Sequence, residues 1–294
     1  MSSPALFVEN APAKVNLTLR VLGRRSDGYH EIESLVAFAE FGDTLSYSPG
    51  GELALTVRGP NAVKAGENAD NLVLKAAQAL AARVAGLGLG AFQLDKRLPV
   101  AAGLGGGSAD AAAALRLLAR ANNLPLDDGR LHDAARVTGA DVPVCLDPRP
   151  RLMRGIGEIL SGPLKLPALP AVLANPGAVL PTKSVFAAWK RAASEPLALD
   201  VTAVAKIANR EEYLQLLATQ ANDLESAAIA VEPAVAEVLA ALRVLAGCRL
   251  ARMSGSGATC FALFSSAAAA IEAAKALSSK YPHWWVRASA LSGG

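Results

Sequence analysis

Pro99-Val-Ala-Ala-Gly-Leu-Gly-Gly-Gly-Ser-Ala109 is the most informative segment of the chain. It runs directly into residues 110–121, which are rich in Ala and Leu, the best helix formers, so we predict a loop that opens a helix at Ser108. Four glycines let backbone amides approach an anion, and a helix start adds free N–H groups and partial positive charge. The stretch predicts a phosphate-binding loop, with an unliganded glycine-rich turn as the alternative.

Two better-known phosphate-binding motifs are excluded by the letters of this loop. A dinucleotide fingerprint needs a glycine three places after Gly105, where Ser108 stands. A Walker A loop needs Gly-x4-Gly-Lys-Ser/Thr, which occurs nowhere in the chain. The loop therefore belongs to a third kind.

The composition is that of a compact folded protein. The 294 residues are enough for two domains, with 19% charged and 52% hydrophobic residues. The net charge of +3 comes from scattered Lys and Arg, so we expect no nucleic-acid partner. Three widely spaced cysteines predict neither a zinc site nor disulfides, and the absence of a basic, apolar leader or membrane span predicts a cytoplasmic protein.

Residues before the loop alternate as in a half-buried strand. Apolar residues at odd positions from Val15 to Val21 place Lys14, Asn16 and Thr18 together on one face. A turn at 26–28 leads to a returning strand at 29–38, with further short strands expected at 43–47 and 52–58. Asp70 or Asn71 is expected to cap a helix that ends near residue 86.

After the loop helix, a second helix is expected from Asp127, with Leu131, Ala134, Ala135 and Val137 inward and Gly139 as a left-handed stop. Asp141 then falls in a loop, and Pro143 biases Val142 toward an extended conformation. The proline-rich segment 143–181 predicts a domain boundary. Beyond it, we expect helices at 222–229 and 233–245, strands at 249–253 and 259–264, a final Ala-rich helix and a strand at 284–290. Helices packed on one side of an antiparallel sheet would give an α+β domain.

The loop resembles that of the GHMP kinase superfamily, named for galactokinase, homoserine kinase, mevalonate kinase and phosphomevalonate kinase, which reads Pro-x3-Gly-Leu-Gly-Ser-Ser. Pro99, Gly103, Leu104 and Gly105 match it. Five further stretches match in order: Ala13-Lys-Val-Asn-Leu17, Arg25-Ser-Asp-Gly-Tyr-His30, Gly139-Ala-Asp-Val-Pro143, Asn222-Asp-Leu-Glu225 and Met253-Ser-Gly-Ser-Gly-Ala258. The extra Gly106 and Gly107 resemble one branch, whose members phosphorylate a cytidine-diphosphate polyol in isoprenoid precursor synthesis.

The resemblance spans nearly the whole chain and implies an ATP-dependent kinase of α+β class with two domains. Residues 1–159 would form a domain like domain 2 of ribosomal protein S5, and residues 160–294 a ferredoxin-like domain. It also implies Mg²⁺, for which no carboxylate identifies itself as a ligand, so the metal ligands stay unknown. The partner would be the small-molecule polyol, with no membrane contact, in a monomer or homodimer.

Carried across, the resemblance makes Lys14 and Asp141 the catalytic pair, cation and base. Without it, Lys14 would be the polar face of an edge strand and Asp141 a solvated carboxylate at a helix end. The residues implied to bind ATP are Pro99, Val100, Ala101, Ala102, Gly103, Leu104, Gly105, Gly106, Gly107, Ser108 and Ala109, with Asn71 and Lys96 at the adenine.

For the acceptor, the resemblance implies that Tyr29 and Phe186 sandwich a cytosine whose polar edge contacts His30. Asn16 would bind a substrate hydroxyl or phosphate, and Thr182 lies in the matching stretch Pro181-Thr-Lys-Ser-Val-Phe186. From the residues alone, a solvated strand face at Asn16 and rim packing at Tyr29 remain open, and Met253–Ala258 reads equally as a tight hairpin.

The loop departs from the superfamily pattern at three alanines. Ala101 and Ala102 stand where many relatives place glycine, and Ala109 where many have serine, which leaves Ser108 as the loop's one hydroxyl. Two other functions fit the same fold: a kinase of homoserine or a mevalonate-like acid, and a catalytically silent nucleotide sensor. The aromatic pair argues against the first, and the presence of both Lys14 and Asp141 against the second.

Overall fold

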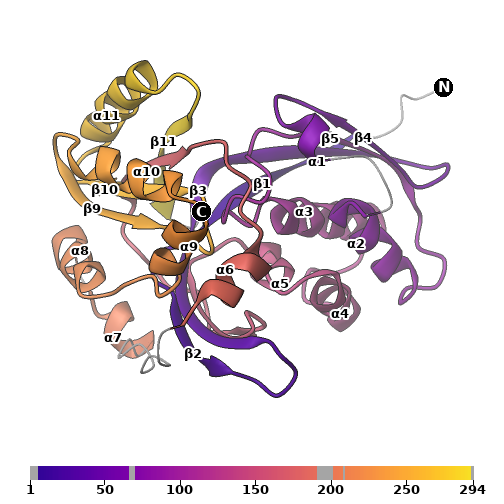
Figure 1. Ribbon diagram of the computed structural model, residues 1–294. Helices are drawn as coiled ribbons and strands as arrows, with labels where there is room; N and C mark the ends of the chain where they lie inside the picture. The colour runs from indigo at the N-terminus through magenta and orange to yellow at the C-terminus, as the bar shows by residue number, and fades with distance from the viewer. Residues whose placement is uncertain (1–5, 66–69, 191–200, 208, 293–294) are drawn as a thin grey trace. The chain divides into compact units, whose positions relative to one another are not determined.

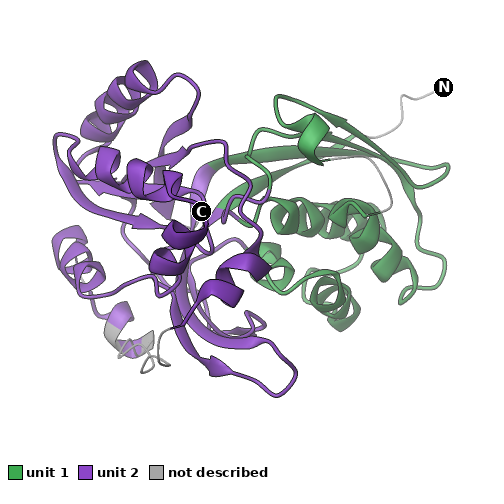
Figure 2. Ribbon diagram, in the orientation of Figure 1, with its two compact units in different colours: residues 1–13, 41–100, 105–147 green, residues 14–40, 101–104, 148–294 purple. Residues whose placement is uncertain are grey.

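The computed structural model describes residues 6–65, 70–190, 201–207 and 209–292 (Figure 1). Two compact units interleave along the chain (Figure 2). Unit 1 comprises residues 1–13, 41–100 and 105–147, and unit 2 comprises residues 14–40, 101–104 and 148–294. Strand β3 (His30–Pro49) contributes its first half to unit 2 and its second half to unit 1. A division into consecutive domains at residue 159 stays a prediction.

Unit 1 combines a small sheet with helices. Strand β5 (Gly90–Asp95) pairs antiparallel with residues 44–49 of β3 and parallel with β4 (Ala54–Arg58). Strand β1 (Phe7–Asn16) begins in this unit. Its helices are α1 (Ala62–Ala65), α2 (Leu72–Ala81), α3 (Gly106–Ala121), α4 (Gly129–Thr138) and α5 (Val142–Leu146), with α2, α4 and α5 packed against α3.

Helix α3 is the centre of unit 1. It begins at Gly106, two residues before the expected Ser108, because Gly105 adopts a left-handed conformation (φ +61°) and caps it. Every residue from Ala109 to Ala119 is buried, which the Ala- and Leu-rich sequence allows on all sides of the helix. Two charged residues, Asp110 and Arg116, are buried with them.

Four expectations for the segment after α3 are wrong. Asp128, not Asp127, caps α4, and Val137 is 63% exposed. Gly139 is extended (φ 174°) and not left-handed. Val142 is helical, because Pro143 lies in the first turn of α5, where a helix does not need the missing N–H.

Unit 2 contains an antiparallel sheet in the order β11 (Trp285–Ser292), β8 (Leu169–Asn175), β10 (Cys260–Phe264) and β9 (Cys248–Met253). Helices α10 (Ala234–Arg243) and α11 (Ala267–Lys280) pack on it, as expected for an α+β domain. Residues 30–36 of β3 pair with β2 (Arg20–Arg24) and β6 (Arg151–Gly155). The remaining elements are β7 (Ile159–Leu160), α6 (Thr182–Ala188), α7 (Val201–Ala205), α8 (Arg210–Ala218) and α9 (Glu225–Val231).

The core of unit 2 lies between its sheet and helices. It is built from apolar side chains of β8, β10, α9, α10 and α11, among them Val172, Phe264, Val238, Leu242 and Leu277. Burial of such side chains is the main stabilising contribution. Within the described parts of the chain, no helix is long and apolar enough to cross a membrane.

Candidate functional site

Within unit 2, the loop segment 101–104 is held by its carbonyl groups. Ala102 O accepts from Thr259 N at 3.1 Å, Gly103 O from the Ser254 hydroxyl at 2.9 Å, and Leu104 O from Lys14 N at 2.9 Å. None of the N–H groups of residues 101–104 donates a hydrogen bond to another described residue. The segment is therefore fixed through its acceptors while its donors remain available to an anion.

At the start of α3, in unit 1, the same pattern continues. The N–H groups of Gly106, Gly107 and Ser108 are among the four that a helix cannot satisfy internally. The first intrahelical bond runs from Ala109 N to Gly105 O at 2.8 Å. Free N–H groups and the positive end of the helix dipole favour a phosphate at such a terminus.

Lys14 and Asn16 lie in a buried polar chain at the end of β1. The Lys14 ammonium donates to Asn16 Oδ1 at 3.1 Å, and Asn16 Nδ2 donates to the Ser34 hydroxyl at 2.7 Å. Asn16 N also donates to Ser254 Oγ at 3.1 Å. Both side chains are at least 96% buried, so the exposed strand face considered from the sequence is wrong. Lys14 is an immobilised cation beside the loop segment.

The glycine turn between β9 and β10 is held by hydrogen bonds with Asn222, which precedes α9, and with Glu225, the first residue of α9. Asn222 Nδ2 donates to the carbonyls of Met253 and Gly255, each at 2.8 Å, and Glu225 accepts from Met253 N at 3.1 Å. Ser256 Oγ lies 2.9 Å from the Thr182 hydroxyl at the start of α6. The turn is thus a hairpin held in place by the segments 222–225 and 181–186.

Aromatic rings gather at α6. His30 stacks on Phe186 with ring centroids 4.7 Å apart, and Trp189 meets His30 edge-on at 5.7 Å. Burial, aided by Arg24, lowers the pKa of His30, so the ring is neutral at pH 7. Tyr29 is 60% exposed. The structure therefore brings His30 and Phe186 together, and a cytosine between Tyr29 and Phe186 stays a prediction.

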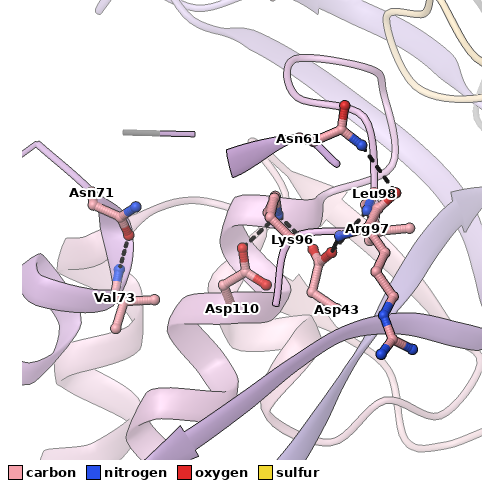
Figure 3. A network of polar contacts seen from close by, with 8 residues as sticks. All are labelled: Asp43, Asn61, Asn71, Val73, Lys96, Arg97, Leu98 and Asp110. Atoms are coloured by element: carbon pink, nitrogen blue, oxygen red, sulfur yellow. Dashed lines mark hydrogen bonds and ion pairs between the residues drawn. The ribbon is translucent and has the colours of Figure 1, made fainter. Parts of the chain in front are cut away.

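Outside the loop, three expected site residues belong to unit 1. Asp141 is half-buried directly before α5. Asn71 caps α2, its Oδ1 accepting from Val73 N at 3.0 Å, which confirms the expected cap. Lys96 is 3% exposed and donates to both Asp43 and Asp110 (Figure 3). Because Lys14 belongs to the other unit, the pairing of Lys14 with Asp141 stays a prediction.

Sequence reasoning missed Asp43, Asp110 and Ser254. Asp110 carried a signal, since it is the only acidic residue in the otherwise Ala- and Leu-rich helix that follows the loop. Asp43 lies 53 residues from Lys96 along the chain, and nothing in a single sequence pairs them. No group of three or more His, Cys, Asp or Glu within the described ranges could hold a metal.

Comparison with known families decides the class of protein. The model for the N-terminal domain of GHMP kinases matches residues 71–147, and that for their C-terminal domain matches residues 199–283. The chain belongs to the GHMP kinase family. It is therefore a kinase, its two-domain α+β fold is confirmed, and membership implies that it uses ATP and acts on a small molecule.

Two relatives of this GHMP kinase are named 4-diphosphocytidyl-2-C-methyl-D-erythritol kinase. The protein of Rhodopseudomonas palustris (strain BisB18) is 56% identical over 99% of this chain and 96% of its own. That of Methylobacterium radiotolerans is 58% identical over 96% of this chain and 97% of its own.

Solved structures give the same family. A crystal structure of 4-(cytidine 5'-diphospho)-2C-methyl-D-erythritol kinase is 36% identical, with TM-score 0.80 over 98% of this chain and all of that one. Homoserine kinase from Cytophaga hutchinsonii, at 20% identity and TM-score 0.75, covers all of this chain and 97% of its own, and shares the fold.

Proposed function

We propose that this chain transfers the γ-phosphoryl group of ATP to the 2-hydroxyl of 4-diphosphocytidyl-2-C-methyl-D-erythritol. The products are the 2-phosphate and ADP, in a mevalonate-independent route to isoprenoid precursors. The observation that carries the proposal is the 56–58% identity, over nearly the whole chain, to two proteins that bear this name. Each unit offers N–H groups that suit the phosphates of ATP: those of residues 101–104 in unit 2, and those at the start of α3 in unit 1.

In the proposed reaction, the acceptor oxygen forms a bond to the γ-phosphorus while the bond to the β–γ bridging oxygen breaks. The hydroxyl proton passes to the Asp141 carboxylate, and the electron pair of the broken bond leaves with ADP. Lys14, held by Asn16 at 3.1 Å, offsets the charge on the migrating phosphoryl group. Catalysis then consists of positioning and charge stabilisation, as in other phosphoryl transfers.

Mg²⁺ would accompany ATP, because it neutralises phosphate charge and is usually held by substrate phosphates with one or two carboxylates. The chemistry of the loop fits this: its side chains offer only the Ser108 hydroxyl, so most of the ligands would be phosphate oxygens and water. No protein ligand is assigned.

The acceptor's cytosine is proposed to stack on the aromatic group of α6. Phe186 offers a ring face, and neutral His30 has both a donor and an acceptor nitrogen for the polar edge of the base. Tyr29, exposed at the turn before β3, is proposed to cover the other face. Asn16 and Thr182 would contact the polyol, and Asn71 the adenine. The buried Lys96 ammonium is bound by Asp43 and Asp110, so no direct contact with the adenine is proposed for it. We further propose a cytoplasmic monomer or homodimer.

A coupled assay of ADP release tests the function. The purified protein is given ATP with 4-diphosphocytidyl-2-C-methyl-D-erythritol, and separately with homoserine and mevalonate. Turnover should require the cytidine-diphosphate acceptor. Preference for homoserine or mevalonate would identify another kinase activity of this family, and nucleotide binding without turnover on any acceptor would identify a sensor.

A further inference from the structure

Asp43 is a buried carboxylate that holds the chain where it enters the phosphate loop. Its Oδ1 accepts from Arg97 N at 2.6 Å and from Leu98 N at 2.8 Å, and these residues directly precede Pro99 (Figure 3). Asn61 bonds the carbonyl of Arg97 at 3.1 Å from the other side. One carboxylate oxygen therefore fixes two successive peptide units at the loop entrance.

The other oxygen of Asp43 reaches the far end of the loop through Lys96. The Lys96 ammonium lies 2.5 Å from Asp43 Oδ2 and 2.5 Å from Asp110 Oδ2, in the second turn of α3. A Cβ atom on Gly106 would lie 3.2 Å from this ammonium, so the cation sits against the first turn of the helix. Asp43, Lys96 and Asp110 form a clamp that joins the loop entrance to the helix start.

Burying the three charged groups of the clamp costs desolvation free energy, so stability alone does not explain the clamp. Three charged groups are each at least 96% buried, and a lysine near a helix N-terminus opposes the helix dipole. A buried ion pair of this kind is often no more stabilising than apolar residues of equal volume. Loss of one partner, however, leaves the other as an unpaired buried charge, which is strongly destabilising. The charges therefore serve geometry more than stability.

The two carboxylates of the clamp are not equivalent. Asp43 accepts hydrogen bonds from three donors with its two oxygens, whereas Asp110 Oδ1 is buried and has no hydrogen-bond partner among the described residues. Burial, and the neighbouring charge of Asp43, raise the pKa of Asp110 to about 7 despite Lys96. Asp43 is thus the end of the clamp with more hydrogen bonds, and Asp110 is the weaker end.

We propose that Asp43 is a positioning residue of the phosphate site, which sets the affinity for the nucleotide's phosphates by holding both ends of the loop through Lys96 and Asp110. It touches neither substrate. The inference rests on the proposed function only in taking residues 99–109 as the phosphate loop.

The experiment compares binding of ATP and of adenosine by calorimetry in Asp43→Asn and the wild-type protein. Asparagine keeps the shape but turns an N–H₂ group toward the Lys96 ammonium, so the link to α3 is lost. ATP should bind about 10- to 150-fold more weakly, the loss expected for one charged hydrogen bond. Adenosine, which lacks phosphates, should change less than about twofold.

A matched control is Glu9→Gln, which removes a carboxylate that pairs with Arg116 and Arg120 in the same unit but outside the loop. It should leave both affinities unchanged. If Asp43→Asn does not fold by circular dichroism, Asp110→Ala opens the clamp from its other end with a good helix former and should show the same selective loss.

Three results would overturn the proposal. Unchanged ATP affinity in the folded variant would show that the loop ends need no clamp. Equal weakening of ATP and adenosine would assign the three residues to the base pocket. Equal weakening in Glu9→Gln would show a general loss of stability. Turnover of the wild-type protein on the acceptor panel is measured in parallel, so failure of the proposed function is recognised separately.

Discussion

Replacing Gly103 with alanine tests the path of the loop segment directly. Gly103 has φ +74°, and a Cβ added there would lie 2.3 Å from Ser254 O and 2.9 Å from Gly257 N. Neither atom can retreat easily, because Gly257 N donates to Ser254 O at 3.0 Å within the turn. A left-handed alanine costs about 1–2 kcal/mol. Overpacking against fixed backbone costs about 1–3 kcal/mol more. We expect Gly103→Ala to lower the free energy of unfolding by about 2–5 kcal/mol, the sum of these two contributions.

The assay is urea denaturation followed by circular dichroism, together with calorimetric titration of ATP. Because the turn and the loop segment share the Ser254–Gly103 hydrogen bond, ATP affinity should fall with stability. Gly129→Ala is the matched control: Gly129 begins α4, and no atom would lie within 4 Å of its Cβ. The control should be stabilised by up to about 1 kcal/mol. A loss below about 1 kcal/mol in Gly103→Ala with unchanged ATP affinity would refute the reasoning, since the left-handed cost alone exceeds it.

Three further changes have defined outcomes. Asp141→Asn should lower turnover about 10²- to 10⁴-fold with substrate dissociation constants nearly unchanged, and a loss under about tenfold would exclude a general base. Phe186→Ala should weaken acceptor binding by about 1–3 kcal/mol. ATP binding, measured alongside, should not change, and equal loss of both would place the cytosine elsewhere. Asp110→Asn should remove a pH dependence of stability. Because the pKa of Asp110 is raised from 3.8 to about 7 in the folded state, the folded protein binds one more proton than the unfolded chain between these pH values, and wild-type stability falls as the pH rises through this range. Urea midpoints at pH 5 and 8 should differ less in Asp110→Asn than in the wild-type protein.

Local signals predicted most of the elements. The cap at Asn71, the strands β9 and β10 and the helices α10 and α11 follow from caps, alternation and helical spacing, which act over a few residues. The errors arose where tertiary context overrode a local preference. Pro143 was taken to bias Val142 toward an extended conformation, although a proline is equally compatible with the first turn of a helix, where the structure places it.

Burial of the polar site residues could not be predicted from the sequence. Lys14 and Asn16 alternate with apolar residues as on any half-exposed strand. The hydrogen-bond partners of Asn16 include Ser34 and Ser254, which lie 18 and 238 residues away along the chain, so the local pattern does not reveal them. Ala101 gives a complementary case. Its φ of +53° is a conformation that glycine adopts without strain, which accounts physically for the glycine that many relatives place there.

The interleaving of the two units sets an order for assembly during synthesis. Every segment of unit 1 has been made once residue 147 leaves the ribosome, whereas residues 38–39 of unit 2 pair with β11, which ends only at Ser292. Chains emerge at about 5–20 residues per second, so this interval lasts roughly 7–30 s. Throughout it, the side chains of Leu19 and Val21 lack the later strands and helices with which they form the core of unit 2. A chain cut at residue 159 would lack these covering elements permanently, so we expect it to expose both side chains.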